Sequence, residues 1–290
     1  MTTPSPALPS PAPARPGPAS LRSTADLPAP AGRAGLGAAI RSEFTKIRST
    51  RSTYWALLAV IVATVGFGVL SSYGAAHSQH PGGPGFDATQ QSLGGLYISQ
   101  LIIAVLGALT ITSEYSTGMV RTSLWALPRR GTVFAAKGIV FTVVALVTGL
   151  ITTFASFFVG QALMSGQHIN ATLGQPDVLR AVIGGALFLT VCGLLAFGIG
   201  MMLRHTAGAI TATIALLFVL SVVVHFLPET WQVHVDKWMP ALAGSGIWAT
   251  VPVPPGATPM FSPWAGFAVL AGYAVVAMAA GLVVFVRRDA

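Results

Sequence analysis

Residues 181–227 read AVIGGALFLTVCGLLAFGIGMMLRHTAGAITATIALLFVLSVVVHFL, and this stretch decides the fold class of the chain. Two long apolar runs are separated in it by only Arg204, His205 and Thr206. Each run is long enough to cross the roughly 30 Å hydrocarbon core of a bilayer as a helix. The short interruption therefore predicts a tight antiparallel hairpin of two membrane-spanning helices.

Apolar runs of the same kind recur along the rest of the chain. Of the 290 residues, 53% are hydrophobic and only 8% are charged, whereas soluble domains carry roughly 25% charged residues. Apart from His225, the runs contain no His, Asp, Glu, Lys or Arg, as expected because a charge is costly to desolvate in lipid. Backbone groups in lipid must be paired internally, which favours helices. The sequence predicts an all-α integral membrane protein with six transmembrane helices, at residues 54–73, 95–112, 138–163, 181–203, 207–227 and 264–286.

The basic residues predict the orientation of these spans. If the N-terminus lies inside, Arg180 and Lys237 are the only two of the 16 Lys and Arg residues that fall outside. Cytoplasmic loops carry an excess of Lys and Arg, so both termini are predicted to be cytoplasmic. The net charge of +8 then reflects topology and attraction to anionic headgroups. The expected partner of these charges is a lipid bilayer, and no nucleic acid is expected.

Two segments outside the spans differ in character. Residues 1–35 form a tail rich in Pro and Ala without an apolar run, so the tail is predicted to be cytoplasmic and disordered. A docking role for its Pro-rich motifs is the alternative. Residues 228–263, on the outer side, are longer than a connection needs to be. They mix Trp, Pro and Gly, and we expect part of them to dip back and cap the outer mouth.

Residues 36–53, just before the first span, have the pattern of an amphipathic helix. Leu36, Ile40, Phe44 and Ile47 recur at helical spacing and form one apolar stripe. Arg, Lys and Glu side chains occupy the remaining positions. Such a pattern is typical of a helix that lies in the headgroup plane of the inner leaflet, where it can act simply as a membrane-surface anchor.

Between the second and third spans, residues 113–137 read SEYSTGMVRTSLWALPRRGTVFAAK. Ser and Thr caps followed by Pro128 predict a short cytoplasmic helix at residues 117–127. Trp125 gives this helix an aromatic anchor, and that combination is typical of a protein-docking surface. An interfacial loop with its Trp at headgroup depth is the alternative. Basic side chains bracket the indole: Arg121, Arg129 and Arg130.

Charged and turn-forming residues appear in a set order around the first two spans. Glu43 and Lys46 lie in RSEFTKIRS, before the first span, and a second group follows the second span: Glu114, Gly118, Pro128, Arg129 or Arg130, and Lys137. In this order the chain resembles the permease subunits of type 2 ABC exporters, particularly those of actinobacteria. The resemblance covers essentially the whole chain after the tail.

The resemblance implies a place and a partner for each of these segments. Residues 36–53 would be a connecting helix, containing Glu43 and Lys46, and residues 117–127 a coupling helix that rests in a cleft of a separate ABC ATPase subunit. The family works as a dimer of permeases, identical or paired, with two ATPase domains in the bacterial cytoplasmic membrane. The residues expected at the ATPase-docking surface are Glu114, Gly118, Arg121, Trp125, Pro128, Arg129 and Arg130.

The sequence lacks the nucleotide-binding motif of an ATP-hydrolysing domain. No G-x-x-x-x-G-K-[ST] phosphate-binding loop occurs in it, so nothing in the chain can hold a nucleotide in that way. We therefore expect the chain to be no enzyme and to bind no cofactor, with ATP and Mg bound by the partner subunit. The predicted function is that of the permease subunit of an ATP-driven exporter for a hydrophobic or amphipathic substrate.

Polar residues inside the spans are candidates for the substrate path. Gln100 and Gln161 are the strongest, although such residues also serve in helix packing. A secondary transporter is disfavoured because no Asp or Glu lies in the apolar runs. A non-transport membrane scaffold and a membrane-embedded enzyme remain as alternatives. His77 and His80 lie on a loop rich in Gly and Pro, and no metal site is expected there.

Overall fold

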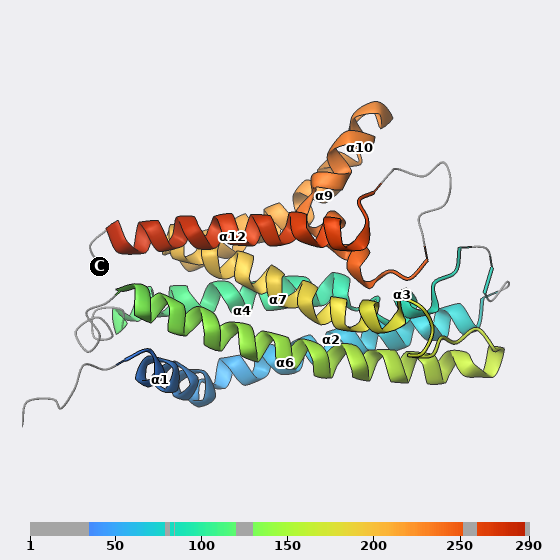
Figure 1. Cartoon of the computed structure of the whole chain (residues 1–290), viewed down its shortest axis with the longest axis horizontal. Coiled ribbons are helices and arrows are strands. Elements are labelled where there is room, and N and C mark those ends of the chain that lie inside the picture. Colours follow the sequence, from blue (N-terminus) through green and yellow to red (C-terminus); the bar gives the residue numbers. More distant parts are fainter. Residues whose placement is uncertain (1–34, 79–81, 84, 120–129, 252–259, 288–290) are drawn as a thin grey trace, which may run out of the picture. The chain divides into compact units, whose positions relative to one another are not determined.

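The computed structural model describes residues 35–78, 82–83, 85–119, 130–251 and 260–287, and all regular structure in these ranges is helical. Six helical segments are long and apolar enough to cross a membrane, which confirms the predicted all-α membrane fold (Figure 1). The spans are α2 (Arg51–Ala76), α4 (Leu96–Thr117), α6 (Arg130–Met164) extended by the turn η2 (Ser165–Gln167), α7 (Val178–Leu203), α8 (Thr206–Ile214) continued through η3 (Ala215–Val219) into α9 (Leu220–Val224), and α12 (Pro263–Arg287).

Helix α7 forms the centre of the bundle and packs against α4, α6 and α12. Phe188, Leu195 and Phe197 on α7 are among its fully buried side chains. Small residues let the backbones approach closely, as is typical of helix packing in membranes. A Cβ on Gly107 of α4 would lie 2.2 Å from the carbonyl oxygen of Gly193 on α7. The backbones of α4 and α7 therefore come into close contact at this point.

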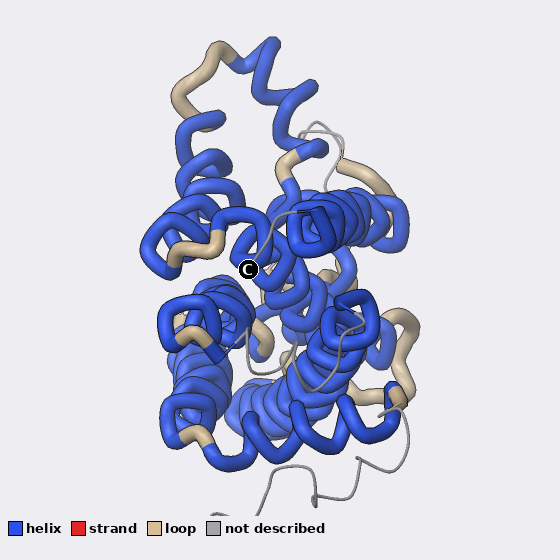
Figure 2. Tube along the Cα trace, turned by 90° about the vertical axis from the view of Figure 1, so that its left-hand side faces the viewer, coloured by secondary structure: helices blue, strands red, loops and turns tan. Residues whose placement is uncertain are grey.

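The fifth span differs from the other five. Helix α8 ends at a π-helical turn, η3, and α9 adds only five residues before the chain leaves the span. Few side chains of this span are buried, as is also the case for α2 and α12. Helix α10 (Glu229–Val235) follows and has no buried residue. Figures 1 and 2 show α9 and α10 standing out from the neighbouring helices.

The rest of the segment after the fifth span returns to the bundle. It contains η4 (Asp236–Trp238), α11 (Pro240–Ser245) and η5 (Gly246–Trp248). Helix α11 and η5 pack against α7 and α12, and Ile247 and Trp248 are completely buried. Part of this segment therefore packs against the spans, whereas no residue of α10 is buried. That it caps the outer mouth stays a prediction.

Two charged side chains, Asp87 and Arg180, hold residues 247–251 at the end of η5 and just after it, and we call this pair the clasp. Asp87 caps the short helix α3 (Ala88–Ser92) and accepts hydrogen bonds from the amides of Thr250 and Val251, at 2.5 and 3.0 Å. Arg180, in the first turn of α7, donates to the carbonyl oxygens of residues 247 and 249, both at 2.9 Å. The clasp therefore ties α3 and α7 to the same five residues, 247–251.

Helix α1 (Leu36–Ser49) lies across the direction of the long helices, as Figures 1 and 2 show. Its Ala39 and Glu43 are buried, on the side that packs against α6. Leu36 and Phe44 of the predicted apolar stripe are exposed. The helix ends at Ser49 because Thr50 is extended, and the Thr50 hydroxyl donates to the Lys46 carbonyl at 2.8 Å.

Candidate functional site

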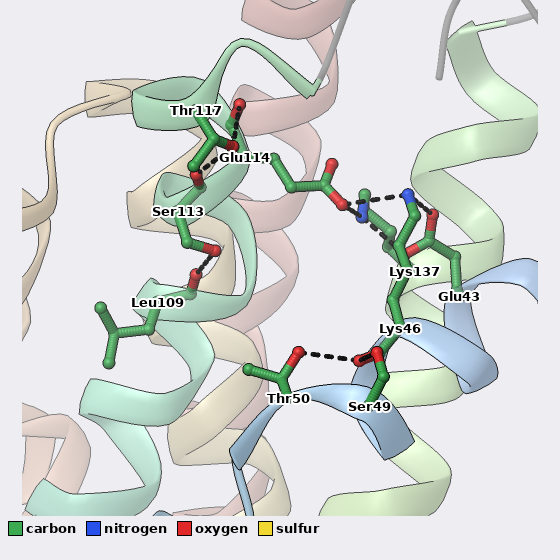
Figure 3. Close-up of polar contacts among 9 residues, drawn as sticks. All are labelled: Glu43, Lys46, Ser49, Thr50, Leu109, Ser113, Glu114, Thr117 and Lys137. Carbon is green, nitrogen blue, oxygen red and sulfur yellow. Dashed lines mark hydrogen bonds and ion pairs between the residues drawn. The ribbon is translucent and has the colours of Figure 1, made fainter. Parts of the chain in front are cut away.

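Four charged residues from three helices meet where α1 crosses the bundle, and we call them the charge cluster (Figure 3). Lys137 of α6 donates to Glu43 Oε2 of α1 at 2.6 Å and to Glu114 Oε1 of α4 at 2.5 Å. Lys46 of α1 donates to Glu43 Oε1 at 2.9 Å and to the same Glu114 oxygen at 3.1 Å. The two lysines and two glutamates form a closed ring of ion pairs.

The charge cluster is shielded from solvent on most sides. Lys137 is 5% exposed, and Glu43 and Glu114 are each 7% exposed. Charges removed from water in this way are costly unless each meets an opposite charge with good geometry. The equal numbers of ammonium and carboxylate groups meet that requirement. Lys137 contacts both carboxylates and therefore joins α1 and α4 to α6.

Lys46 lies on the more solvent-exposed side of the charge cluster. Its side chain is more exposed than that of Lys137. Burial lowers the pKa of Lys46, but hydrogen bonds and the charges of Glu43 and Glu114 raise it more, so the pKa lies above its ordinary value of 10.5. The ammonium group therefore stays protonated at neutral pH, and the charge balance of the cluster is kept.

The lengths of α4 and α6 bring these residues together. Helix α6 has 35 residues, whereas about 20 are enough to span a bilayer, and its extra turns carry Lys137 beyond the apolar run. Helix α4 ends at Gly118, whose φ of 70° is left-handed and favours glycine. Glu114 thus lies in the last turn before the connection between the second and third spans.

A cleft of about 440 Å³ lies beside the charge cluster. Its walls come from the end of α1, the start of α2 and the end of α4. Hydroxyl groups are frequent on these walls, and several donate to carbonyl oxygens of their own helix, as Ser113 does to Leu109 at 2.7 Å. Their remaining lone pairs add polar groups to a cleft surface that is mostly apolar. The polar residues that line it include Thr53, Thr110, Ser113 and Thr117.

Only some of the predicted docking residues fall in the described part of the chain. Arg130 begins α6, and its Nη1 donates to the carbonyl oxygens of Phe285 and Val286 at 3.2 and 3.4 Å. A basic side chain at the carboxyl end of a helix satisfies free carbonyls and complements the helix dipole. Arg130 thus contacts the end of α12. Four predicted docking residues lie outside the described residues: Arg121, Trp125, Pro128 and Arg129.

Arg204 at the end of α7 makes a similar contact that the sequence did not suggest. Its Nη2 donates to the carbonyl oxygen of Val284 at 3.1 Å, and its guanidinium lies 5.1 Å from the ring centre of Tyr115. Arg130 and Arg204 together hold the carboxyl end of α12 against α6 and α7. The only sequence signal for Arg204 was its place directly after the apolar run of the fourth span.

The two predicted path residues lie in different surroundings. Gln161 donates from Nε2 to the Ala88 carbonyl at 3.0 Å and to Ser92 Oγ at 3.2 Å, and its Oε1 accepts from the Ala171 amide at 2.7 Å. It thereby ties α6 to α3. Gln100 is buried in α4, and its Nε2 donates to the Tyr97 carbonyl at 3.1 Å. The two glutamines therefore have different partners, and their place in a substrate path stays a prediction.

Metal-binding groups are scattered over the described residues. No three His, Cys, Asp or Glu side chains gather there at a spacing that could hold a metal ion. His77 stacks on Tyr73 with ring centres 4.1 Å apart. His80 lies outside the described residues.

Comparison with known protein families shows which family this chain belongs to. Residues 39–223 match the model of the ABC-2 family transporter proteins. The chain belongs to the ABC-2 transporter family. The matched region runs from α1 to α9 and contains the whole charge cluster. No curated protein matches the sequence. The predicted resemblance to ABC-2 permeases is thus confirmed, and the chain is a multi-pass membrane protein and a transport permease of this family.

Proposed function

We propose that this permease is the membrane subunit of an ATP-driven exporter that moves a hydrophobic or amphipathic substrate across the bacterial cytoplasmic membrane. The family match supports a transport role. The missing phosphate-binding loop indicates that ATP and Mg are bound by a separate ABC ATPase subunit. The chain works as one half of a pair of permeases, as a homodimer or beside a related chain.

The observation that carries this proposal is the position of Lys137. Glu114 and Lys137 stand on the two sides of residues 115–136, which include the predicted coupling helix, and their side chains bind each other. Lys137 also binds Glu43 on α1. A push on the segment between Glu114 and Lys137 would therefore reach α1, α4 and α6 together. Interfaces of this kind transmit motion as rigid bodies.

The orientation of the permease follows from its charges. We place the α1 end of the bundle, the charge cluster and both termini in the cytoplasm, because that arrangement leaves only Arg180 and Lys237 of the 16 basic residues outside. The ATPase would then dock against the segment after Glu114, through Trp125 and its neighbouring arginines. The exposed apolar side chains of α1, Leu36 and Phe44, would rest on the inner leaflet.

The proposal can be tested with the ABC ATPase encoded beside this gene, if one is present. We expect the permease to co-purify with that ATPase and to stimulate its ATP hydrolysis. Trp125→Ala and Arg121→Glu should each abolish both effects, because they remove the anchor and reverse the charge of the docking surface. Trp231→Ala, on exposed helix α10, is the matched control and should change neither. Unchanged co-purification and stimulation in the first two variants would count against the proposal.

A further inference from the structure

The first turns of α2 carry an exposed face that begins with a cation. Arg51, Trp55, Leu58 and Val62 are spaced by four, three and four residues, so they lie on one side of the helix. All four side chains are exposed, Trp55 at 70% and Val62 at 61%. The buried residues of α2 lie on another side of the helix. We call the four exposed residues the α2 stripe.

The α2 stripe changes in chemistry along the helix. Arg51 begins the helix, Trp55 follows about one turn later, and the aliphatic Leu58 and Val62 lie further along the span. The stripe covers about 16 Å of helix, close to half of the roughly 30 Å hydrocarbon core. A phospholipid has the same order of groups: a phosphate, then ester groups at the interface, then acyl chains. Arg and Trp side chains favour the first two of these levels.

Helix α1 brings two more arginines to the same end of the bundle. Arg41, Phe44 and Arg48 are spaced by three and four residues and form one exposed side of α1. A single residue joins α1 to α2. The Tyr54 hydroxyl donates to the Arg48 carbonyl at 2.8 Å, which holds Arg48 beside the first turn of α2. We call residues 48–55 the α1–α2 corner.

The positive charge of the α1–α2 corner is not balanced within the described part of the chain. The carboxylates that the structure describes at this end are already bound by the lysines of the charge cluster. Of the described carboxylates, none forms an ion pair with Arg41, Arg48 or Arg51. The first turn of α2 also contains no acid, and no side chain caps its amides. Such a helix start adds to the attraction for an anion.

We propose that the α1–α2 corner binds one anionic phospholipid of the inner leaflet, with its phosphate at Arg48 and Arg51 and an acyl chain along the rest of the α2 stripe. The inference rests on the orientation in the proposed function, which places this corner in the inner leaflet, and it names the lipid partner. Phosphatidylcholine binds less well, because its own ammonium group cancels the charge of its phosphate. Bound there, the lipid holds α1 on the side away from Glu43 and the charge cluster.

Quenching of Trp55 fluorescence by brominated lipids tests the site on the permease alone. The full-length protein is placed in phosphatidylcholine bilayers with increasing fractions of phosphatidylglycerol or phosphatidylcholine, both brominated in the same acyl chains. The Trp55 signal is the difference between the unmodified protein and Trp55→Phe. Each arginine near an anionic surface contributes a roughly fivefold preference. We therefore expect phosphatidylglycerol to reach half-maximal quenching at a fraction tenfold or more below that of phosphatidylcholine.

Variants assign this preference to the α1–α2 corner, each measured with and without Trp55→Phe. Arg51→Gln and Arg48→Gln should each lower the preference about fivefold, and Arg51→Lys should keep most of it. Arg287→Gln is the matched control, because it removes the same charge from an exposed position at the end of α12. This control should leave the preference intact.

Three results would overturn the proposal. The two lipids could quench Trp55 equally, or neither could quench it because a second copy of the chain covers the α2 stripe. Arg287→Gln could also lower the preference as much as Arg51→Gln, which would mean that the whole basic end attracts anionic lipids without a site. A failure of ATPase pairing would leave these quenching ratios unchanged, so the two proposals fail separately.

Discussion

The charge cluster and the clasp fasten two different parts of one helical bundle, and they use different chemistry. In the charge cluster, side-chain charges from α1, α4 and α6 pair with one another. In the clasp, Asp87 and Arg180 instead bind backbone amides and carbonyls of residues 247–251. The charge cluster needs four side chains of matched charge, whereas the clasp needs two side chains and the backbone of residues 247–251.

This difference predicts what happens when one side chain is removed from the charge cluster or from the clasp. If Lys137 leaves the charge cluster, two buried carboxylates keep only the more exposed Lys46 as a partner, and one buried negative charge is left unbalanced. If Asp87 leaves the clasp, the freed groups are backbone amides near the surface, since Val251 is 38% exposed. Water can then replace part of what is lost. The charge cluster should therefore break as a unit across three helices, whereas the clasp should loosen locally.

The largest effect is expected for Lys137→Met. This change removes the more buried of the two cations that both carboxylates contact and should lower the free energy of unfolding by about 3–5 kcal/mol. Reversible unfolding of the purified permease in mixed micelles measures it. Lys137→Arg keeps the charge and should cost clearly less. A loss below about 1 kcal/mol for Lys137→Met, the range of surface ion pairs, would show that the charge cluster holds nothing together.

A smaller and local effect is expected for Asp87→Asn. Loss of the charged acceptor should cost about 1–3 kcal/mol, and hydrogen exchange should become faster in residues 247–251. Residues 106–117, next to the charge cluster, should exchange at their original rate. Asp177→Asn serves as the control, because this carboxylate binds Arg180 but is largely exposed. Faster exchange in both regions at once would mean that the two fastenings are not independent.

The smallest effect is expected for Lys46→Met. Lys137 still neutralises part of the charge on Glu43 and Glu114, and the Lys46 side chain is 28% exposed, so the cost should be about 1 kcal/mol or less. The raised pKa of Lys46 fixes the sign of the pH dependence. Its contribution is fully present at neutral pH and is lost only as the pH rises above 10.5 toward the folded-state pKa. A cost equal to that of Lys137→Met would contradict the assigned roles.

The sequence predicted the spans because each depends on a local property, a long apolar run. The ends of the helices were predicted less accurately. The apolar run of the third span begins after Lys137, but α6 starts at Arg130. A charged residue interrupts the apolar pattern without breaking the helix, since Lys is a good helix former. The π-helical turn in the fifth span leaves no mark in the apolar pattern and could not be predicted.

The residues of the charge cluster were predicted, but the contacts that join the three helices were not. Glu43, Lys46, Glu114 and Lys137 were all singled out, but the pairing of Lys137 with Glu43 spans 94 positions, and spacing along one helix cannot show it. Asp87 of the clasp was missed because a lone acid on a loop rich in Gly and Pro resembles any solvated residue. Arg180 and Arg204 bind distant backbone carbonyls. Every residue has a carbonyl group, so such contacts leave no pattern in the sequence.

We propose that force from an ATPase enters the permease between Glu114 and Lys137. A cryo-electron microscopy structure of the permease with its partner ATPase tests this claim most directly. We predict that residues 115–136 rest in a cleft of the ATPase, with Lys137 still bound to Glu43 and Glu114. A complex in which this segment touches only lipid or its own chain would contradict the account.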